Sequence, residues 1–493
     1  MTRLLPLTSI FLILQGTALQ AQDTSFDLRG SVQDEPSLED TVETEQLETT
    51  RQNPVNELQN RPNVAALPRR LNAATAEVGS TGLGTAGRVT AQRPFSDRLA
   101  AVQKSEGQRT RPIDGTVFDG ETVFDQPKGL RLGTFNILPE LNVTGGWTDN
   151  AAGSSSGTSS MLYRIAPSIE GSSQWSRHQL DFALRGSYVS YPDSSEDDDP
   201  ELSASAGLRL DLTSLTRADI GASYSYSRED TSSAENPDGD NHVHELAGSL
   251  GVTRDAGLVS VTLGAGVERT LYTADETLTS TSGRDNTLYS AGLRLDSNGG
   301  GSFSPFVEGA LLVRRFDRAC SDTLCEKRDA TGYELRGGLT IAKGPKLNGE
   351  VGAGWRIENL EDNRLDALQG VVVDASLVWS PSRLTTVTAG LGTSFEPTDI
   401  DTASGSIIYS GDLRLAHAFS DRFVGETGVG YSTRDYQGIS LTENTLTGYA
   451  GLTYALTRNI ALEAQYRFTA FDSTNSGSDY TSNAIEAGLR FRH

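Results

Sequence analysis

The sequence predicts an all-β protein, a transmembrane antiparallel up-and-down β-barrel of about 18 strands (roughly 16–18) that follows a disordered N-terminal periplasmic region. From about Phe135 to His493, short segments alternate apolar and polar residues. The gaps between them alternate between long polar stretches and tight turns. Beyond the N-terminus, no apolar run reaches the length of about 18 residues that a spanning helix needs. This combination is typical of outer-membrane barrels.

The first 21 residues have the features of a secretory signal peptide. Arg3 supplies a positive charge, residues 4–14 are mostly apolar, and Ala18-Leu19-Gln20-Ala21 offers a cleavage site after Ala21. An apolar run of this length is too short for a retained anchor helix. We therefore expect residues 1–21 to be removed on export.

Residues 22–130 form the expected disordered periplasmic region. The segment is polar and has no aromatic residue between Phe26 and Phe95. Such a composition buries too little apolar surface to offset the entropy lost on folding. The sequence Thr-Val-Phe-Asp occurs twice within 116–125. This repeat is either a docking motif for a periplasmic partner or an apolar segment that rests against the base of the barrel.

Residues 131–493 form the expected barrel. The first strand is predicted over 135–147, with Leu141, Val143 and Trp147 on one face. The clearest strand covers 202–212, where leucine and alanine alternate with serine, glycine and charged residues. Because successive side chains of a strand point to opposite sides, this pattern places one face in an apolar medium and the other in water.

The spacing of the gaps predicts the orientation of the barrel. Tight gaps fall near Ser173, Ser214 and Asp255, and long gaps fall near 149–159, 192–200 and 229–241. An even number of strands leaves both ends of the barrel segment on the tight-turn side, which is the periplasm in bacterial barrels. The long loops then face outward from the cell.

The residues of opposite parity are expected to line the lumen, and they carry many charges of both signs. Such residues are costly at the lipid midplane, about 2–4 kcal/mol for each Arg or Lys, so they indicate a water-filled interior. The predicted lumen-lining residues are Arg185, Arg209, Asp211, Arg294, Glu308, Arg314, Glu334, Arg336, Glu350, Arg356, Asp412, Arg414, Glu463 and Arg467.

Two functions are compatible with this interior. In the first, the charges line an aqueous channel that passes hydrophilic solutes. In the second, they pair with one another and hold the wall rigid, and the barrel acts as a structural or surface-interaction protein through its loops or its periplasmic region. About 18 strands enclose more space than side chains alone fill, which favours the channel.

Composition excludes several other functions. With 42 basic and 65 acidic residues, the chain lacks the excess of Lys and Arg that nucleic acid requires. Cys320 and Cys325 lie in one predicted loop, and we expect a disulfide between them in an oxidising compartment. The five histidines form no nucleophile constellation, so we expect no enzyme, no metal site and no cofactor.

Two C-terminal segments carry a family resemblance: the alternating Gly-containing strand at 446–454 and the closing segment Ile485-Glu486-Ala487-Gly488-Leu489-Arg490-Phe491. The chain resembles the β-barrel porins of Gram-negative bacteria that often occur with exopolysaccharide export genes. The resemblance implies an outer-membrane channel, with polysaccharide as a candidate cargo, and supplies no catalytic residues. The expected partners are outer-membrane lipid, lipopolysaccharide and the barrel-assembly machinery. Two residues follow Phe491, which departs from the usual terminal aromatic.

Overall fold

The computed structural model describes residues 129–493 except 174, 176, 195–197, 230–231, 237–240, 275–282, 299–301, 320–323, 344–346, 383 and 421. The predicted signal peptide, the expected disordered region and the repeat at 116–125 therefore lie outside the described residues. Within the described part, no helix is both long and apolar enough to cross a membrane.

The barrel is built from strands of 12 to 16 residues that succeed one another along the chain, preceded by the three-residue strand β1. Their bounds are β1 Leu130–Leu132, β2 Phe135–Thr148, β3 Ser160–Ser173, β4 His178–Ser190, β5 Asp199–Asp211, β6 Thr216–Arg228, β7 Asn241–Asp255, β8 Val259–Ala274, β9 Asn286–Ser297, β10 Phe303–Phe316, β11 Ala330–Lys343, β12 Leu347–Leu360, β13 Leu368–Ser382, β14 Thr385–Glu396, β15 Gly405–Ala418, β16 Phe423–Gln437, β17 Thr442–Ala455, β18 Ile460–Ser473 and β19 Tyr480–Arg492.

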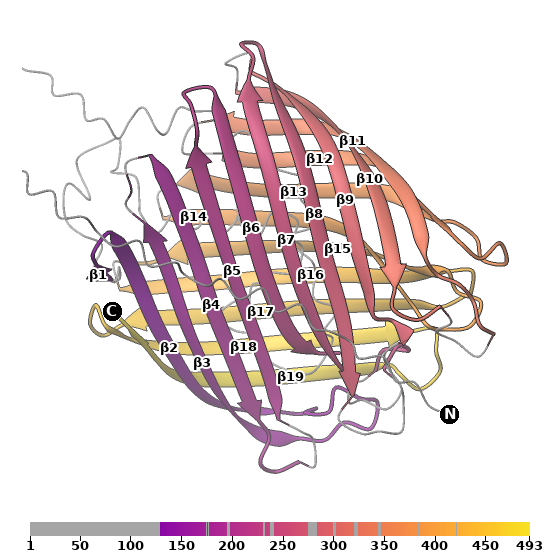
Figure 1. The fold of residues 1–493 in the computed structure, drawn as a ribbon. Coiled ribbons are helices and arrows are strands. Elements are labelled where there is room, and N and C mark those ends of the chain that lie inside the picture. The colour runs from indigo at the N-terminus through magenta and orange to yellow at the C-terminus, as the bar shows by residue number, and fades with distance from the viewer. Residues whose placement is uncertain are drawn as a thin grey trace, which may run out of the picture. The chain divides into compact units, whose positions relative to one another are not determined.

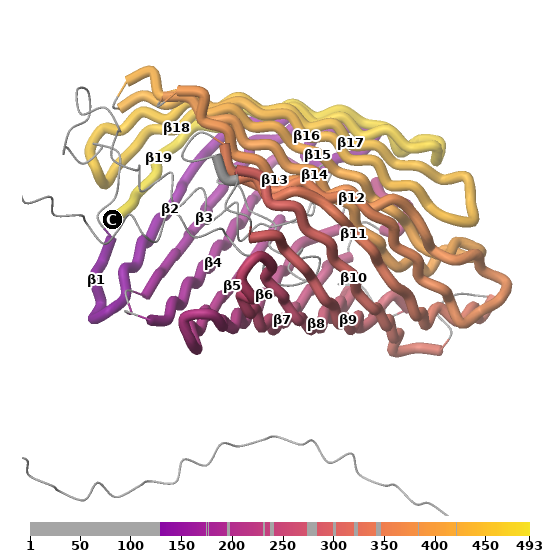
Figure 2. The backbone as a smooth tube through the Cα atoms, turned by 90° about the horizontal axis from the view of Figure 1, so that it is seen from above, coloured from indigo at the N-terminus to yellow at the C-terminus, as the bar shows by residue number. Residues whose placement is uncertain are grey.

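Strands β2 to β19 close into an antiparallel barrel of 18 strands, as the sequence predicts. Each strand pairs with the next along the chain, and β19 returns to pair with β2. In Figure 1 the first half of the barrel faces the viewer and the second half lies behind it; Figure 2 shows the ring of strands from above. Closure gives each of the strands β2–β19 a partner on both sides, which is what a lipid environment requires.

The seam of the barrel explains the short strand β1. Strand β19 pairs with Glu140–Thr148 of β2, and β1 pairs with Phe135–Ile137 below it. The amide of Gly129 donates to the carbonyl of His493 over 3.1 Å, so the two chain segments meet end to end along β2. The amide of Arg492 also bonds to the carbonyl of Asn459 in the neighbouring turn. The two residues after Phe491 thus complete the seam.

The alternation of side chains divides each strand between lipid and lumen. On β3, Met161, Tyr163 and Ile165 are exposed on the outer face, whereas Arg164 between them is only 2% exposed. Trp147 lies at the long-loop end of β2 and Trp379 near the short-turn end of β13, and both are exposed. Aromatic rings at the two ends of the apolar band are typical of barrels in membranes.

The connections also alternate as predicted. The turns 212–215, 256–258 and 456–459 are short, whereas the loops 149–159, 229–240 and 317–329 are long. The long connections lie at one end of the barrel, called here the long-loop end, and the connections at the other end have two to five residues. The β16–β17 connection (438–441) also lies at the long-loop end, although it has only four residues. The inward residues of β2–β19 and the long loops that cover them form the part of the molecule where function must be sought.

The lipid-facing position of the outer residues predicts a depth-dependent cost for a charge. Leu311, near the middle of β10, is 68% exposed, and Leu258, in a short turn, is 77% exposed. We expect Leu311→Arg to lower the free energy of unfolding by about 2–4 kcal/mol, and Leu258→Arg by about 0–1 kcal/mol. Reversible guanidinium unfolding in phospholipid vesicles measures both. Equal costs at the two positions would contradict a membrane-embedded middle of the barrel.

Candidate functional site

The predicted lumen residues lie at the parity opposite the exposed apolar residues. They are distributed over eight strands: Arg185 on β4, Arg209 and Asp211 on β5, Arg294 on β9, Glu308 and Arg314 on β10, Glu334 and Arg336 on β11, Glu350 and Arg356 on β12, Asp412 and Arg414 on β15, and Glu463 and Arg467 on β18. Their contact with water or solute stays a prediction. Their surroundings, however, differ sharply from one side of the barrel to the other.

On strands β9–β13 the inward charges form a dense buried group, called here the central ion cluster (Arg294, Asp296, Glu308, Arg336, Glu350 and Asp374). The guanidinium of Arg294 donates two bonds to Glu350, over 2.9 and 3.1 Å. Arg336 bonds to Glu308 over 2.6 Å and also to Asp374. These side chains are at most 7% exposed. The cluster therefore fastens five neighbouring strands together.

An aromatic ring completes this group. The guanidinium of Arg294 lies 3.7 Å from the ring centroid of Phe306, which is buried. The ring lies over Gly338 and Gly352 on the next two strands, where a Cβ atom would overlap its Cζ. Removing one partner from such a buried network leaves an uncompensated charge, which costs about 3–5 kcal/mol. This sector of the wall is sealed by its own side chains.

A second buried group lies above the first on β10 and β12. Arg314 donates to Glu358 over 3.1 Å, and Arg356 bonds to the same carboxylate. Arg314 also donates to the backbone carbonyl of Phe395 over 3.1 Å. Arg356 lies 4.8 Å from the centroid of that phenylalanine ring. Arg314 and Arg336 are thus clamps within the wall and are poorly placed to act as free selectivity charges.

Strands β3–β6 present a more open surface. Arg185 pairs with Glu170, and their side chains are 19% and 26% exposed. Arg209 pairs with Asp211 over 3.1 Å, with 34% and 35% exposure. The other inward residues of this sector are mainly small, such as Ser203. We call this part of the wall the open sector, because these two ion pairs remain partly accessible.

The described residues of the β6–β7 loop (229 and 232–236) fold inward across the long-loop end of the barrel. The amide of Ala234 donates to Glu443 on β17 over 2.8 Å, and the hydroxyl of Ser233 bonds to the same carboxylate over 3.4 Å. Six strands lie between β6 and β17 in the ring: β5, β4, β3, β2, β19 and β18. Ser232 also donates to the carbonyl of Gly153 in the β2–β3 loop. The loop therefore spans much of the opening.

The tip of the β14–β15 hairpin also folds inward, because β14 separates from β13. The ladder between these strands stops at the pair Ala375–Leu391. Beyond it, the hydroxyl of Thr393 replaces the ladder by bonding to the amide of Val373 over 2.9 Å and to its carbonyl over 3.1 Å. The hairpin then packs into the lumen through a buried apolar cluster formed by Leu368, Val372, Phe395 and Ile407.

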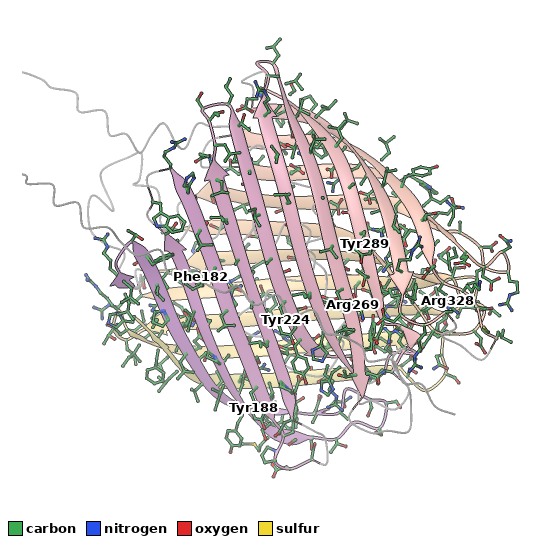
Figure 3. The ribbon with its side chains drawn as sticks, in the orientation of Figure 1. Phe182, Tyr188, Tyr224, Arg269, Tyr289 and Arg328 are labelled. Carbon is green, nitrogen blue, oxygen red and sulfur yellow. The ribbon has the colours of Figure 1, made fainter. Side chains whose placement is uncertain are left out.

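A buried arginine holds this hairpin tip in place. Arg328, in the β10–β11 loop, donates to the carbonyl of Ile400 over 2.9 Å and also to that of Ala403. Its neighbour Glu326 pairs with it over 2.9 Å and accepts the amide of Thr402 over 3.1 Å. Figure 3 shows Arg328 at the long-loop end of the barrel. Buried hydrogen bonds to charged groups of this kind are each worth about 1.5–3 kcal/mol.

The two inward segments meet at a buried ion group, called here the mouth lock (Glu229, Glu235 and Arg284). Arg284 donates to both oxygens of Glu229, over 2.7 and 2.9 Å, and lies 3.5 Å from Glu235. Glu235 lies beside Thr398 of the β14–β15 loop. Burial raises the pKa of Glu235 to about 7, although Arg284 opposes that shift. The pKa of Glu229 is instead lowered, because its pairing with Arg284 outweighs burial.

Sequence reasoning missed the mouth lock, as well as Arg328 and Glu443. Charged residues are ordinary in water-exposed loops and at the ends of barrel strands, so nothing in the sequence indicates that these side chains are buried. The predicted disulfide stays a prediction, because Cys320 lies outside the described residues. His244, near the start of β7, bonds to the hydroxyl of Tyr224 over 3.0 Å and to that of Thr273 over 3.3 Å. Within the described residues, no group of three His, Cys, Asp or Glu side chains is placed to hold a metal.

Comparison with known proteins identifies a family. A family model described as putative beta-barrel porin 2 matches residues 125–493. No curated protein matches the sequence. The copper transporter OprC is 9% identical, with a TM-score of 0.40 over 74% of this chain and 82% of that chain. The outer membrane protein opdK from Pseudomonas aeruginosa is 12% identical, with a TM-score of 0.36 over 73% and 99%.

A third solved structure, the FrpB iron transporter from Neisseria meningitidis, is 9% identical, with a TM-score of 0.39 over 74% of this chain and 83% of that chain. At these TM-scores the similarities carry no argument about solutes or mechanism.

The mouth lock predicts that Arg284→Met loosens the β6–β7 loop. The substitution keeps most of the side-chain volume but leaves the buried Glu229 and Glu235 without their cation, a loss of about 3–5 kcal/mol. We expect amide hydrogen exchange at residues 232–236 to rise at least tenfold, as measured by mass spectrometry on the folded protein. Arg269→Met is the control, because Arg269 pairs with the half-exposed Asp317 on the outer side (Figure 3). Unchanged exchange in Arg284→Met would contradict the lock.

The pKa of Glu235 predicts that the lock weakens as the pH rises. Below about pH 4.5, Glu235 is protonated whether the loop is closed or released; between 4.5 and about 7, only the released form ionises. The closed form therefore loses stability through this range, while Glu229 stays ionised because its pKa is lowered. We expect faster exchange at 232–236 at pH 8 than at pH 5, after correction for the intrinsic rates. In Glu235→Gln this difference should disappear; a difference that persists would exclude Glu235 as its cause.

Proposed function

This chain belongs to the putative beta-barrel porin 2 family, and we propose that it is an outer-membrane channel that passes hydrophilic solutes, polysaccharide chains among them, through a mixed-charge aqueous lumen. The observation that supports this most directly is the size and polarity of the interior. A barrel of eight strands can be filled by side chains, whereas one of 18 strands encloses a much wider space.

The open sector supplies a polar path along the wall. Its inward residues on β5 and β6 include Ser203, Ser223 and Ser225, which project little into the lumen. The charged pairs beside them expose between 19% and 35% of their side chains. A lumen lined in this way lowers the barrier that the bilayer presents to a hydrated solute. The sealed sector on β9–β13 would supply the rigid wall opposite.

The signs of the inward charges favour neutral cargo. Arg209 lies two residues from Asp211, Arg217 two residues from Asp219, and each forms an ion pair on its own strand. Adjacent opposite charges largely cancel beyond the Debye length of about 8–10 Å. Such a wall offers hydrogen bonds without a strong field, which suits uncharged or weakly charged hydrophilic chains. The resemblance to porins that occur with exopolysaccharide export genes points to the same class of cargo.

The inward-folded loops imply that passage is gated. The β6–β7 loop and the β14–β15 hairpin cover the long-loop end in a closed arrangement held by the mouth lock and Arg328. In this proposal, solute passes when the β6–β7 loop leaves its place against Glu443 on β17. Both predictions on the lock therefore bear on conduction as well as on stability, and no catalytic step is part of the proposal.

A second candidate function is supported by the same covering loops and by the sealed sector. In it, the barrel is a structural or surface-interaction protein that does not conduct. The buried ion pairs of the central ion cluster and the closed mouth are what such a role would need. The two functions differ in one measurable property, which is permeation.

Conductance of the refolded mature protein in a planar bilayer tests the channel, and swelling of liposomes in neutral sugars tests passage of uncharged solutes. We expect stable current steps that are larger or more frequent at pH 8 than at pH 5, and more frequent in Arg284→Met. The structural role would be favoured if neither the unchanged protein nor Arg284→Met gave current at either pH, and if no liposomes swelled. Heat-modifiable gel mobility shows that both proteins are folded.

The open sector also predicts ion preference. Arg185→Gln combined with Arg209→Gln removes two accessible cations, so we expect cation permeability relative to anion permeability to rise about twofold or more. The matched pair Glu170→Gln and Asp211→Asn removes their partners and should shift preference toward anions. Reversal potentials in a salt gradient measure both. Shifts of the same sign in the two variants, or no shift in either, would exclude this sector as the conducting path.

A further inference from the structure

A small polar pocket opens on the inner wall where β16–β19 meet β2 and β3. Its lining includes Asn142, Arg164, Tyr449, Glu463, Glu486 and Arg490. Tyr449 is the eighth residue of the 14 in β17, so the pocket lies near mid-height of the barrel. It is separate from both the mouth lock and the central ion cluster, which involve other strands.

The centre of the pocket is an aromatic ring laid flat on the wall. The ring of Tyr449 lies against Gly428 on β16, where a Cβ atom would overlap it. Its hydroxyl donates to Glu426 over 3.0 Å, which fixes the ring in this orientation. The next inward position on β17 is Gly451, which also lines the pocket and leaves the space beside the ring open. The glycines thus create a seat for the ring and a space next to it.

Hydrogen-bonding groups of both kinds surround this ring. The amide nitrogen of Asn142 donates to Glu463 over 2.6 Å, while its carbonyl oxygen is buried and has no hydrogen-bond partner among the described residues. The hydroxyl of Thr144 donates to Glu486 over 2.6 Å, and Arg164 pairs with the same carboxylate over 3.1 Å. A buried acceptor without a donor is costly, so it favours a ligand that supplies one.

The charges of the pocket cancel. Arg164 pairs with Glu486, Arg490 with Glu463, and Arg414 with Glu426. Each carboxylate therefore has its own guanidinium. A pocket with balanced charge, several donors and acceptors and one flat aromatic face has no preference for an ion. It matches a ligand whose hydroxyl groups both donate and accept and whose C–H face can rest on a ring.

The contrast with Phe306 shows that this arrangement is particular to one side of the lumen. That ring also lies over glycines, but the guanidinium of Arg294 covers it at 3.7 Å and Arg336 lies at 5.8 Å. Its environment is filled and buried, whereas Tyr449 is only partly buried and borders a pocket. The same packing of an aromatic ring over glycine therefore occurs in a filled part of the wall at Phe306 and beside an open pocket at Tyr449.

We propose that the pocket around Tyr449 is a binding site for a sugar unit of a neutral carbohydrate, with the ring of Tyr449 as the stacking platform and Asn142, Arg164 and Glu486 as its hydrogen-bonding partners. The proposal deepens the proposed channel function and rests on it for its physiological meaning. The site itself can be tested without any flux.

The test is equilibrium binding of maltohexaose and of cellohexaose to the full mature protein folded in detergent. Isothermal titration calorimetry and saturation-transfer NMR measure the binding. We expect saturable binding of at least one of the two sugars. Tyr449→Ala should weaken that binding about tenfold or more, as truncation of a tyrosine anchor commonly does. Tyr449→Phe keeps the ring and should retain most of the affinity.

Tyr431→Ala is the matched control. Tyr431 lies on the adjacent strand β16 and is 51% exposed on the lipid face, where its hydroxyl bonds to Asn444. We expect its affinity for the sugar to equal that of the unchanged protein. Heat-modifiable gel mobility establishes that each variant is folded. If Tyr449→Ala does not fold, Tyr449→Phe still tests the proposal, because loss of sugar binding with the ring retained would contradict the stacking role.

Three outcomes overturn the site: no saturable binding of either sugar, equal affinity in Tyr449→Ala, or preferential binding of a sulfated hexasaccharide over the neutral ones. Liposome swelling then separates this proposal from the channel. Swelling without sugar binding rejects the site alone. Sugar binding that depends on Tyr449, without swelling or conductance, rejects the channel and leaves the site as a surface for carbohydrate recognition.

Discussion

Every feature of this molecule depends on one constraint: a sheet in a lipid bilayer has no water to satisfy an open edge. Strand β19 therefore returns to β2, and β1 and the C-terminal residues complete the part of the β2 edge that β19 does not reach. Closure fixes which side of every strand meets lipid. Apolar residues such as Leu311 occupy one parity, and most charged residues of the strands are directed to the lumen.

The lumen has to accommodate those polar residues, and it does so in two ways. On β9–β13 long side chains neutralise one another until the wall is closed, with Arg294 and Arg336 as its fastening points. On β3–β6 the small inward side chains project little into the lumen, and the ion pairs Arg185–Glu170 and Arg209–Asp211 remain partly exposed. A barrel that was rigid all round would be difficult to open. One that was open all round would lack the clamps that hold the inward β14–β15 hairpin in place, such as the hydrogen bond from Arg314 to the carbonyl of Phe395 on β14.

The strands could be predicted from the sequence because their pattern is local. A period of two within 10 to 15 residues decides which side chains face lipid, and Leu202 and Ser203 reveal their sides without reference to any other strand. The inward loops could not be predicted in that way. Ala234 and Glu443 are far apart in the sequence, and only closure of the ring brings them together. For the same reason, the local sequence around Arg336 does not predict that its side chain pairs with Glu308 and Asp374 on neighbouring strands.

The arrangement separates access from recognition. The mouth lock lies in loops beyond the strands, where a change in the ionisation of Glu235 alters only the fit of the β6–β7 loop. The pocket around Tyr449 lies at mid-height on strands that keep their full ladders with both neighbours. Opening the mouth therefore need not disturb the pocket, since the loop is held by Glu443 near the end of β17 and Tyr449 lies six residues further along that strand. In the proposed channel, a solute released from the pocket would meet the open sector on the adjoining strands, so that a gate, a recognition surface and a path would act in series within one sheet.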